Sequence, residues 1–255
     1  MTTDTIRYTL DAGVATVTLN RPDVRNGLNR TLRRELRDAV LRAADEARVL
    51  VLTGAGTSFC SGQDLSENIT ADVERALRDD YEPLLTALYD CRVPTLAAVN
   101  GAAAGAGANL ALACDVVIAT ESAVFLQAFA RIGLIPDAGG TWWLPRQVGF
   151  ARAMGAALFA EPVPARDAAA WGMIWQAVPD ADFAATVAAR ARQLAQGPTA
   201  SYRLIKQALR ASLGNTLPDQ LALEARLQAE AAATADFREG VAAFLEKRPA
   251  RYEGR

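Results

Sequence analysis

The sequence predicts an α/β protein with an all-helical C-terminal region, and three observations support this fold class. Short apolar runs alternate with segments of helical periodicity through residues 1–183. Several of these runs end at glycines, as strands do where they enter a tight loop. From about Ala184 the apolar runs stop, and only amphipathic segments follow. We therefore expect a mixed body over residues 1–183 and a helical region over residues 184–255.

The N-terminal residues predict a β-hairpin and then a helix. The stretch TIRYTLDAGVATVTLN alternates around Gly13, with residues 14–19 as the second strand. Residues 29–47 follow with a helical pattern that starts at a cap on Asn29 or Thr31. One face of this helix carries Leu32, Leu36, Val40 and Ala43. We expect that face to be buried.

The middle of the chain repeats strands and helices. Buried strands are expected in RVLVLTG and VPTLAAVNG, and further strands in DVVIAT and AVFLQAF. A polar loop, AGTSFCSGQDLSEN, precedes a helix that runs to about Cys91, and AAAGAGANLALAC is a glycine–alanine turn that opens another helix. A further helix after Asp137 runs towards Gly149.

The last quarter of the chain predicts four amphipathic helices and no strand. They lie in TVAARARQLAQ, SYRLIKQALRAS, PDQLALEARLQAEAAAT and ADFREGVAAFLEKR. A helical tail on an α/β body is often a docking or oligomerisation element, and we expect that role here.

The composition narrows the possible chemistry. The chain has 255 residues, a net charge of −2 and no histidine, which removes Ser-His and Cys-His pairs and imidazole ligands. Any acid–base work then falls to a carboxylate, Tyr, Lys or Cys. Cys60, Cys91 and Cys114 show no metal-ligand spacing, so we expect buried, reduced thiols and no metal. With no long apolar run, no secretory pattern and no basic excess, we expect a cytoplasmic protein that binds neither membrane nor nucleic acid.

Two glycine-rich loops resemble nucleotide motifs but fit neither of the common ones. GAAAGAGAN contains Gly105 and Gly107, but Leu110 occupies the third glycine position of a dinucleotide fingerprint. GAGTSFCSG lacks the Gly-Lys-Ser/Thr of a phosphate loop. As a pair, the loops could bring two backbone N–H groups to one point and form an oxyanion hole. The alternative is tight strand–helix packing that needs small residues.

Five motifs in order resemble the crotonase, or enoyl-CoA hydratase/isomerase, superfamily. They are LNRPDVRNGLN, SFCSGQDL, VNGAAAGAGANLALACDVVIA, IGLIPDAGGTWWLPRQVG and REGVAAFLEKRP. The resemblance implies a spiral of ββα units and a helical trimerisation region, assembled as a homotrimer or a dimer of trimers. It also implies an acyl-CoA thioester substrate, with no separate cofactor, and an enolate held by the backbone N–H groups of Gln63 and Ala106.

The resemblance also places the acid–base chemistry. Asn109 and Phe129 stand where hydratases of the superfamily carry two glutamates, so hydration by that pair is not expected. QAFARIGLIPDAGGTW, RAMGAALF and AAAWGMIWQAV look like the ring-1,2-epoxyphenylacetyl-CoA isomerase subgroup, in which the aspartate at Asp137 is the acid–base. The implied reactions are conversion of the ring epoxide to oxepin-CoA and movement of a 3-enoyl-CoA double bond to position 2.

Several residue roles remain open at this stage. Asp137 fits a helix N-cap as well as a catalytic acid–base, and apolar neighbours and a helix N-terminus would shift its pKa in opposite directions. Asn109 would either hydrogen-bond to substrate or pair with polar groups at a buried helix start. Tryptophans such as Trp142 more often pack in a core than stack on a substrate ring. The expected acyl pocket comprises Phe129, Leu134, Ile135 and Trp142. The resemblance places coenzyme A against Val24, Arg25, Asn26, Asp64 and Leu65, and against Phe244 and Lys247, often across a subunit boundary.

Three other functions compete with the isomerase. The helix over residues 29–47 is rich in arginine, so RNA binding is one rival, although a solvated basic face near the coenzyme A phosphates is the simpler account. Its arginines are Arg30, Arg33, Arg34, Arg37 and Arg42. A non-catalytic acyl-CoA-binding protein is the second rival, and another reaction of the superfamily, such as hydration or dehalogenation, is the third.

Overall fold

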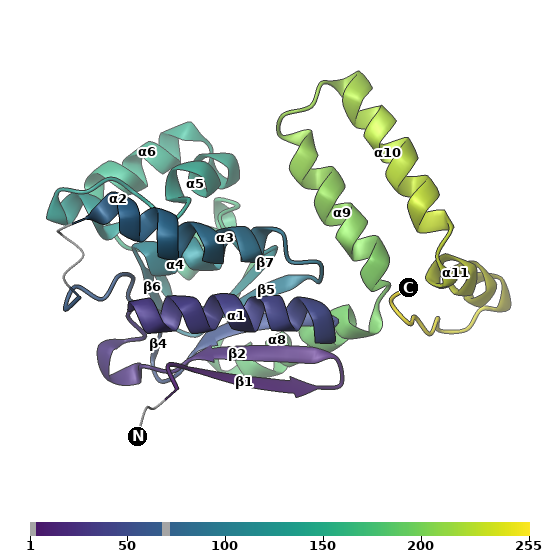
Figure 1. Cartoon of the computed structure of the whole chain (residues 1–255), viewed down its shortest axis with the longest axis horizontal. Coiled ribbons are helices and arrows are strands. Elements are labelled where there is room, and N and C mark those ends of the chain that lie inside the picture. The colour runs from purple at the N-terminus through teal and green to yellow at the C-terminus, as the bar shows by residue number, and fades with distance from the viewer. Residues whose placement is uncertain (1–3, 68–71) are drawn as a thin grey trace.

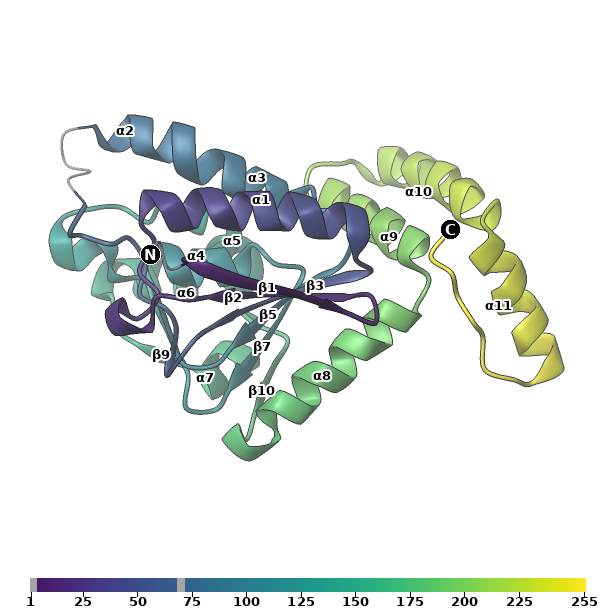
Figure 2. The ribbon, with the colours of Figure 1, turned by 60° about the horizontal axis from the view of Figure 1, so that its bottom comes forward.

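The structure, a computed structural model, describes residues 4–67 and 72–255 and is built around two sheets. The larger sheet has the strand order β1-β2-β3-β5-β7-β10 (Figures 1 and 2). The hairpin β1–β2 is antiparallel, as predicted, and β3, β5, β7 and β10 continue in parallel. The strands are β1 (Ile6–Asp11), β2 (Val14–Leu19), β3 (Val49–Gly54), β5 (Thr95–Val99), β7 (Val116–Thr120) and β10 (Gln176–Val178).

A smaller sheet makes the chain a spiral of ββα units. Its order is β4 (Ser58–Cys60), β6 (Ala102–Ala104), β8 (Val124–Leu126) and β9 (Val163–Pro164). In the successive pairs β3–β4, β5–β6 and β7–β8, the first strand joins the larger sheet and the second joins the smaller one. The predicted α/β class is confirmed. The strand predicted in AVFLQAF ends earlier than expected, because residues 128–132 form the short 3-10 helix η3.

Helix α1 (Arg30–Glu46) covers one face of the larger sheet (Figure 2). The Asn29 side chain caps it by accepting the Leu32 N–H at 2.8 Å. The predicted face, with Leu32, Leu36, Val40 and Ala43, is buried, as expected for an amphipathic helix on a sheet. The same helix also buries the charged side chain of Arg33, which the apolar pattern did not indicate.

The remaining helices of the body connect strands on both sides of the two sheets. They are η1 (Pro22–Val24), α2 (Val73–Ala76), the π-helix η2 (Leu77–Tyr81), α3 (Glu82–Tyr89), α4 (Ala106–Leu112), α5 (Gly140–Val148), α6 (Phe150–Phe159) and α7 (Ala165–Ala170). α1 and the α2–α3 segment lie side by side on the same side of the larger sheet (Figure 2).

The C-terminal helices divide into one that packs on the sheet and three that project from the body (Figure 1). Helix α8 (Asp180–Gln196) starts before Ala184, so the expected boundary between residues 183 and 184 falls inside it. Its Ala191 and Ala195 pack on the larger sheet against the side opposite α1. The projecting helices are α9 (Thr199–Ser212), α10 (Leu217–Ala232) and α11 (Ala235–Glu246). None of the described helices combines the length and apolar character needed to cross a bilayer.

Candidate active site

A pocket of about 220 Å³ brings the two glycine-rich loops together with Asp137. Its walls come from the loop after β4, the start of α4, the α2–η2 segment, and η3 with the loop that follows it. It is lined by Ser61, Gly62, Gln63, Leu65, Val73, Ala76, Leu77, Tyr81, Gly105, Ala106, Ala128, Phe129, Arg131, Ile132, Leu134 and Asp137. Of the described residues that line it, Asp137 alone carries a carboxylate.

The two glycine loops are positioned by backbone geometry. Gly62 and Gly105 have φ angles of +90° and +52°, which favour glycine. Leu28 donates its N–H to Gly62 O at 2.8 Å and accepts the Asp64 N–H at 3.3 Å, so the intervening Gln63 N–H is turned away from Leu28. Ala106 is the first residue of α4, where an N–H has no acceptor within the helix. A Cβ built on Gly62 would lie 3.4 Å from the Ala106 nitrogen, so the two backbones are neighbours.

Asp137 lies in the loop between η3 and α5, and its carboxylate is largely buried. One carboxylate oxygen, Oδ1, is buried without a hydrogen-bond partner in the described part of the chain. Burial raises the pKa of Asp137 to about 6, and a hydrogen bond from its own backbone opposes this rise. The side chain does not cap α5, whose N-cap is Gly139. The Asp137 carbonyl oxygen accepts the Gly140 N–H at 2.8 Å in the turn that leads into α5.

Asn109 holds the Asp137 loop from inside α4. Its side chain is fully buried, and Nδ2 donates to the Asp137 carbonyl oxygen at 2.7 Å. Its Oδ1 accepts a 2.8 Å hydrogen bond from Nε2 of Gln127. Gly140 permits this approach, because a Cβ there would collide with the Asn109 amide. The structure therefore gives Asn109 a positioning contact, and it is not among the residues that line the pocket.

The four residues expected in the acyl pocket are placed differently. Phe129 and Leu134 line the pocket, whereas Ile135 and Trp142 do not. Ile135 is 77% exposed. Trp142 lies on α5 and faces α3, where its ring meets Tyr89 edge-on at 5.8 Å and stacks under the Arg146 guanidinium at 4.2 Å.

Of the residues expected at coenzyme A, Leu65 lines the pocket, and Val24 and Arg25 contact the lining residue Ser61. Ser61, at the pocket, donates its N–H to Arg25 O at 2.9 Å and its hydroxyl to Val24 O at 3.2 Å. Asn26 is fully buried and donates to three carbonyl oxygens of the β3–β4 loop and β4, so its side chain is occupied within the fold. Leu65 is 69% exposed at the pocket.

Asp64 and the two tail residues have other surroundings. The Asp64 carboxylate forms a 2.8 Å ion pair with Arg21, and a hydrogen bond from Ser66 is the main cause that lowers its pKa. Phe244 is 82% exposed on α11, and Lys247 follows that helix with a φ of +55°. Neither of these two lines the pocket within one chain.

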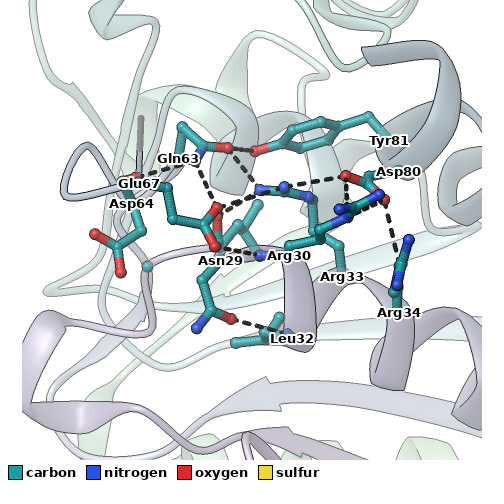
Figure 3. A network of polar contacts seen from close by, with 12 residues as sticks. Asn29, Arg30, Leu32, Arg33, Arg34, Gln63, Asp64, Glu67, Asp80 and Tyr81 are labelled. Carbon is teal, nitrogen blue, oxygen red and sulfur yellow. Dashed lines mark hydrogen bonds and ion pairs between the residues drawn. The ribbon is translucent and has the colours of Figure 1, made fainter. Parts of the chain in front are cut away.

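Sequence reasoning missed a polar network behind the Gln63 loop (Figure 3). Arg33 and Tyr81 both bind the side-chain oxygen of Gln63. Arg33 follows Leu32 directly, so its pattern is that of a solvated helix face, and only the structure reveals its burial. The other arginines of α1 named above are each at least a third exposed and ion-paired: Arg30, Arg34, Arg37 and Arg42.

The cysteines and acids form no further site in the described residues. Cys60, Cys91 and Cys114 are buried free thiols, as expected, and burial raises the pKa of Cys60 to about 12. Within residues 4–67 and 72–255, no three Cys, Asp or Glu side chains are grouped as metal ligands would be.

Known proteins similar to this chain span its full length. A relative from Rhodobacter capsulatus, named "Probable enoyl-CoA hydratase", is 62% identical over all of both chains. The 1,2-epoxyphenylacetyl-CoA isomerase of Escherichia coli is 46% identical, over 96% of this chain and 97% of its own. The crystal structure of an enoyl-CoA hydratase from Bacillus anthracis superimposes with a TM-score of 0.92 at 31% identity, covering 98% of this chain and 100% of that one. The family model for enoyl-CoA hydratase/isomerase matches residues 9–255, and this chain belongs to that family.

Proposed function

We propose that this family member is an acyl-CoA isomerase that moves a double bond with Asp137 as its single acid–base. One observation carries the proposal: among the described residues that line the pocket, Asp137 has the one carboxylate, and it shares the pocket with apolar side chains and with Gln63 and Ala106. With a pKa of about 6, Asp137 is mostly ionised at neutral pH and still holds a proton well enough to return it.

The proposed isomerisation needs one proton and no water. The Asp137 carboxylate removes a proton from C2 of a 3-enoyl-CoA, and the C2–H electrons form a dienolate whose charge rests on the thioester oxygen. The same carboxyl group then returns the proton to C4: the C3–C4 π electrons take it, the C1–C2 π electrons move to C2–C3, and the thioester carbonyl forms again. Atoms and charge balance, because the proton taken is the proton given back.

The negative thioester oxygen is assigned to the N–H groups of Gln63 and Ala106. Donors fixed in place before the reaction stabilise such charge without reorganising, and loss of one donor typically slows a reaction about 100- to 1,000-fold. The apolar walls at Phe129 and Leu134 support the proposal further, since a dry pocket protects a dienolate from water.

Ring expansion is the natural extension of this chemistry. The Escherichia coli relative acts, by its name, on 1,2-epoxyphenylacetyl-CoA. That substrate offers the same parts, a thioester that accepts charge and an acidic C2–H. We therefore include conversion of ring-1,2-epoxyphenylacetyl-CoA to oxepin-CoA in the proposal.

Hydration of a 2-enoyl-CoA is the second candidate, and the name of the Rhodobacter relative favours it. Addition of water needs one group to activate the water and a proton donor for C2. Asn109 and Phe129 supply no carboxylate, so Asp137 would have to do both. Isomerisation fits this pocket better.

The test offers 3-enoyl-CoA and 2-enoyl-CoA separately and identifies the products by ultraviolet absorbance and mass. An isomerase converts the 3-enoyl substrate to the conjugated 2-enoyl thioester and adds no water. Hydration of the 2-enoyl substrate without any double-bond migration would overturn the proposal.

The projecting helices support a proposed oligomer. Together with Tyr252 and Pro198, helices α9–α11 line an apolar groove of about 870 Å³. The groove carries large exposed side chains, including Leu221, Phe237 and Phe244. We propose a homotrimer or dimer of trimers in which a neighbouring chain brings Phe244 and Lys247 towards coenzyme A. Sedimentation tests it: a monomer at micromolar concentration would contradict this assembly.

A further inference from the structure

The Gln63 side chain is fixed at both ends of its amide group. Its Oε1 accepts hydrogen bonds from Arg33 Nη1 at 2.7 Å and from the Tyr81 hydroxyl at 2.6 Å. Its Nε2 donates to the Asp64 carbonyl oxygen at 3.0 Å. Figure 3 shows the amide of Gln63 reaching the guanidinium of Arg33 and the hydroxyl of Tyr81. A side chain held this firmly restricts the main chain from which it extends.

Arg33 also contacts Leu28, whose backbone pairs with the Gln63 loop. It is 1% exposed, and the Nη1 that binds Gln63 also donates to the Leu28 carbonyl oxygen at 2.8 Å. Leu28 in turn binds both Gly62 and Asp64, the residues on either side of Gln63. Arg33 Nη1 therefore binds both the Gln63 side chain and Leu28, the residue whose backbone pairs with the residues flanking Gln63.

The charge of Arg33 is balanced inside the protein. Its Nη2 lies 3.5 Å from carboxylate oxygens of both Asp80 and Glu67. A buried charge is costly unless it is paired, and loss of one partner of such a pair destabilises strongly. Movement of the Arg33 guanidinium away from these carboxylates would therefore cost free energy.

The π-helix η2 brings two neighbouring residues to this network. Asp80 and Tyr81 are consecutive, yet both are buried, at 7% and 4% exposure. Asp80 faces Arg33, Arg30 and Arg34, and the Tyr81 ring lies under the Arg33 guanidinium at 4.8 Å. Single π-turns inside α-helices are rare and often occur at functional sites.

The Gly62–Gln63 peptide is the part that needs such support. With φ of +90°, Gly62 is in a conformation that glycine leaves easily, and rotation of this peptide would turn the Gln63 N–H out of the pocket. We infer that Arg33 and Tyr81 are positioning residues that act through the Gln63 side chain to aim the Gln63 N–H at the thioester oxygen. This inference rests on the proposed function, because it assumes that the N–H polarises a thioester.

Three variants test the inference: Tyr81→Phe, Gln63→Leu and Arg33→Lys. Each keeps the Gln63 N–H but loosens its support. Since a displacement of about 1 Å can cost on the order of 100-fold in rate, we expect kcat to fall about 10-fold in Tyr81→Phe and about 100-fold in Gln63→Leu. KM should stay within about 3-fold, because Phe and Leu keep apolar surface at the two substituted positions that line the pocket. Arg33→Lys keeps the positive charge but loses the planar guanidinium and its several N–H donors. Its kcat should therefore lie between the kcat values of Tyr81→Phe and Gln63→Leu.

The matched control is Arg34→Met. Arg34 also pairs with Asp80, at 3.5 Å, but its side chain is 54% exposed and forms no hydrogen bond with Gln63. This change removes an ion pair of the same carboxylate without touching the Gln63 amide. We expect wild-type kcat, because the Gln63 amide keeps its hydrogen bonds to Arg33 and Tyr81.

A spectroscopic readout separates positioning from a general structural role. The probe is butyryl-CoA with isotope-labelled thioester carbonyl carbon, and infrared difference spectra record its carbonyl stretch when bound. Wild type and Arg34→Met should show the same shift to lower frequency, and Tyr81→Phe and Gln63→Leu a smaller one. Wild-type kcat and a wild-type carbonyl shift in both of these variants would overturn the inference. No carbonyl shift in the wild-type enzyme would instead refute the proposed oxyanion hole itself.

Discussion

The two glycine loops that we propose as the oxyanion hole both line the pocket, but different forces hold them in place. The Gln63 loop is braced by long polar side chains from α1 and η2, with Arg33 and Tyr81 at the centre. The Ala106 loop is held by backbone and close packing: Gly105 donates to Leu126 O at 2.7 Å, and Gly107 lies against Cys60. A buried ionic network holds the Gln63 loop, and close packing of small residues holds the Ala106 loop.

This difference predicts which substitutions harm which donor. Substitutions in the polar network of α1 and η2 should act mainly on the Gln63 N–H. Added volume at Gly107, which lies against Cys60, should act mainly on the Ala106 N–H. Asp137 belongs to neither loop, so the rate of an Asp137 variant is the reference against which loop variants are compared.

The largest effect should come from Asp137→Asn, which removes the proposed base without a substitution in either loop. General acid–base catalysis contributes about 100- to 10,000-fold, so turnover of 3-enoyl-CoA should fall at least about 1,000-fold. The infrared shift of bound butyryl-CoA should persist. Turnover close to wild type would assign the proton transfer to another group.

Gly107→Ala should damage the packed loop next most strongly. A Cβ at this position would lie 2.7 Å from Cys60 Cβ and Sγ, so the start of α4 must move. We expect a loss of about 1–3 kcal/mol in the free energy of unfolding, as for other overpacked cores. The carbonyl shift should also weaken.

Gly214→Ala is the control for Gly107→Ala, because nothing lies within 4 Å of the added Cβ and the backbone is not in the left-handed region. Its stability and kcat should match wild type. Equal effects of the two substitutions on denaturant unfolding would contradict the packing argument.

The sequence could predict the parts that follow local rules. The hairpin, the buried face of α1 and the capping by Asn29 follow from alternation, helical spacing and cap chemistry. The glycine loops and Asp137 could be named as a set, and the structure places them around one pocket.

The residues that support the site could not be predicted in the same way. Arg33 has the sequence context of a solvated arginine, and its burial depends on Asp80, 47 positions later, reached through a π-helix that no periodicity indicates. The sign of the pKa shift of Asp137 also required the fold, because it depends on how completely neighbours exclude water. The exposure of Ile135 and the turn of Trp142 towards α3 likewise depend on tertiary packing.

The pH dependence of the rate should reflect the titration of Asp137 and should not depend on either glycine loop. Its pKa is raised to about 6, and the ionised form is the base, so kcat/KM for 3-enoyl-CoA should fall about tenfold per pH unit below pH 6 and level off above it. Burial raises the pKa of Tyr81, so its hydroxyl stays protonated through this range. A rate profile that is flat from pH 5 to pH 8 would remove Asp137 from the rate-determining proton transfer.

The stability of Asp137→Asn shows by the sign of its change whether Asp137 is a functional or a structural acid. The folded pKa of Asp137 exceeds its ordinary value of 3.8, so ionisation destabilises the fold as pH rises from about 4 to 6, and the penalty stays constant above that. Asp137→Asn should therefore raise the free energy of unfolding by about 1–3 kcal/mol at pH 8 and by little at pH 4. Denaturant titrations at the two pH values check this, and a destabilised variant at pH 8 would contradict it.

The most direct measurement follows the proton itself. A 3-enoyl-CoA deuterated at C2 is converted in ordinary water, and the product of the first turnovers is examined by mass and magnetic resonance. If Asp137 carries one proton from C2 to C4 in a dry pocket, deuterium appears at C4 of the 2-enoyl product, and Asp137→Asn yields no product. Hydrogen at C4 drawn wholly from solvent, with turnover retained in Asp137→Asn, would show that a second group or water does the work.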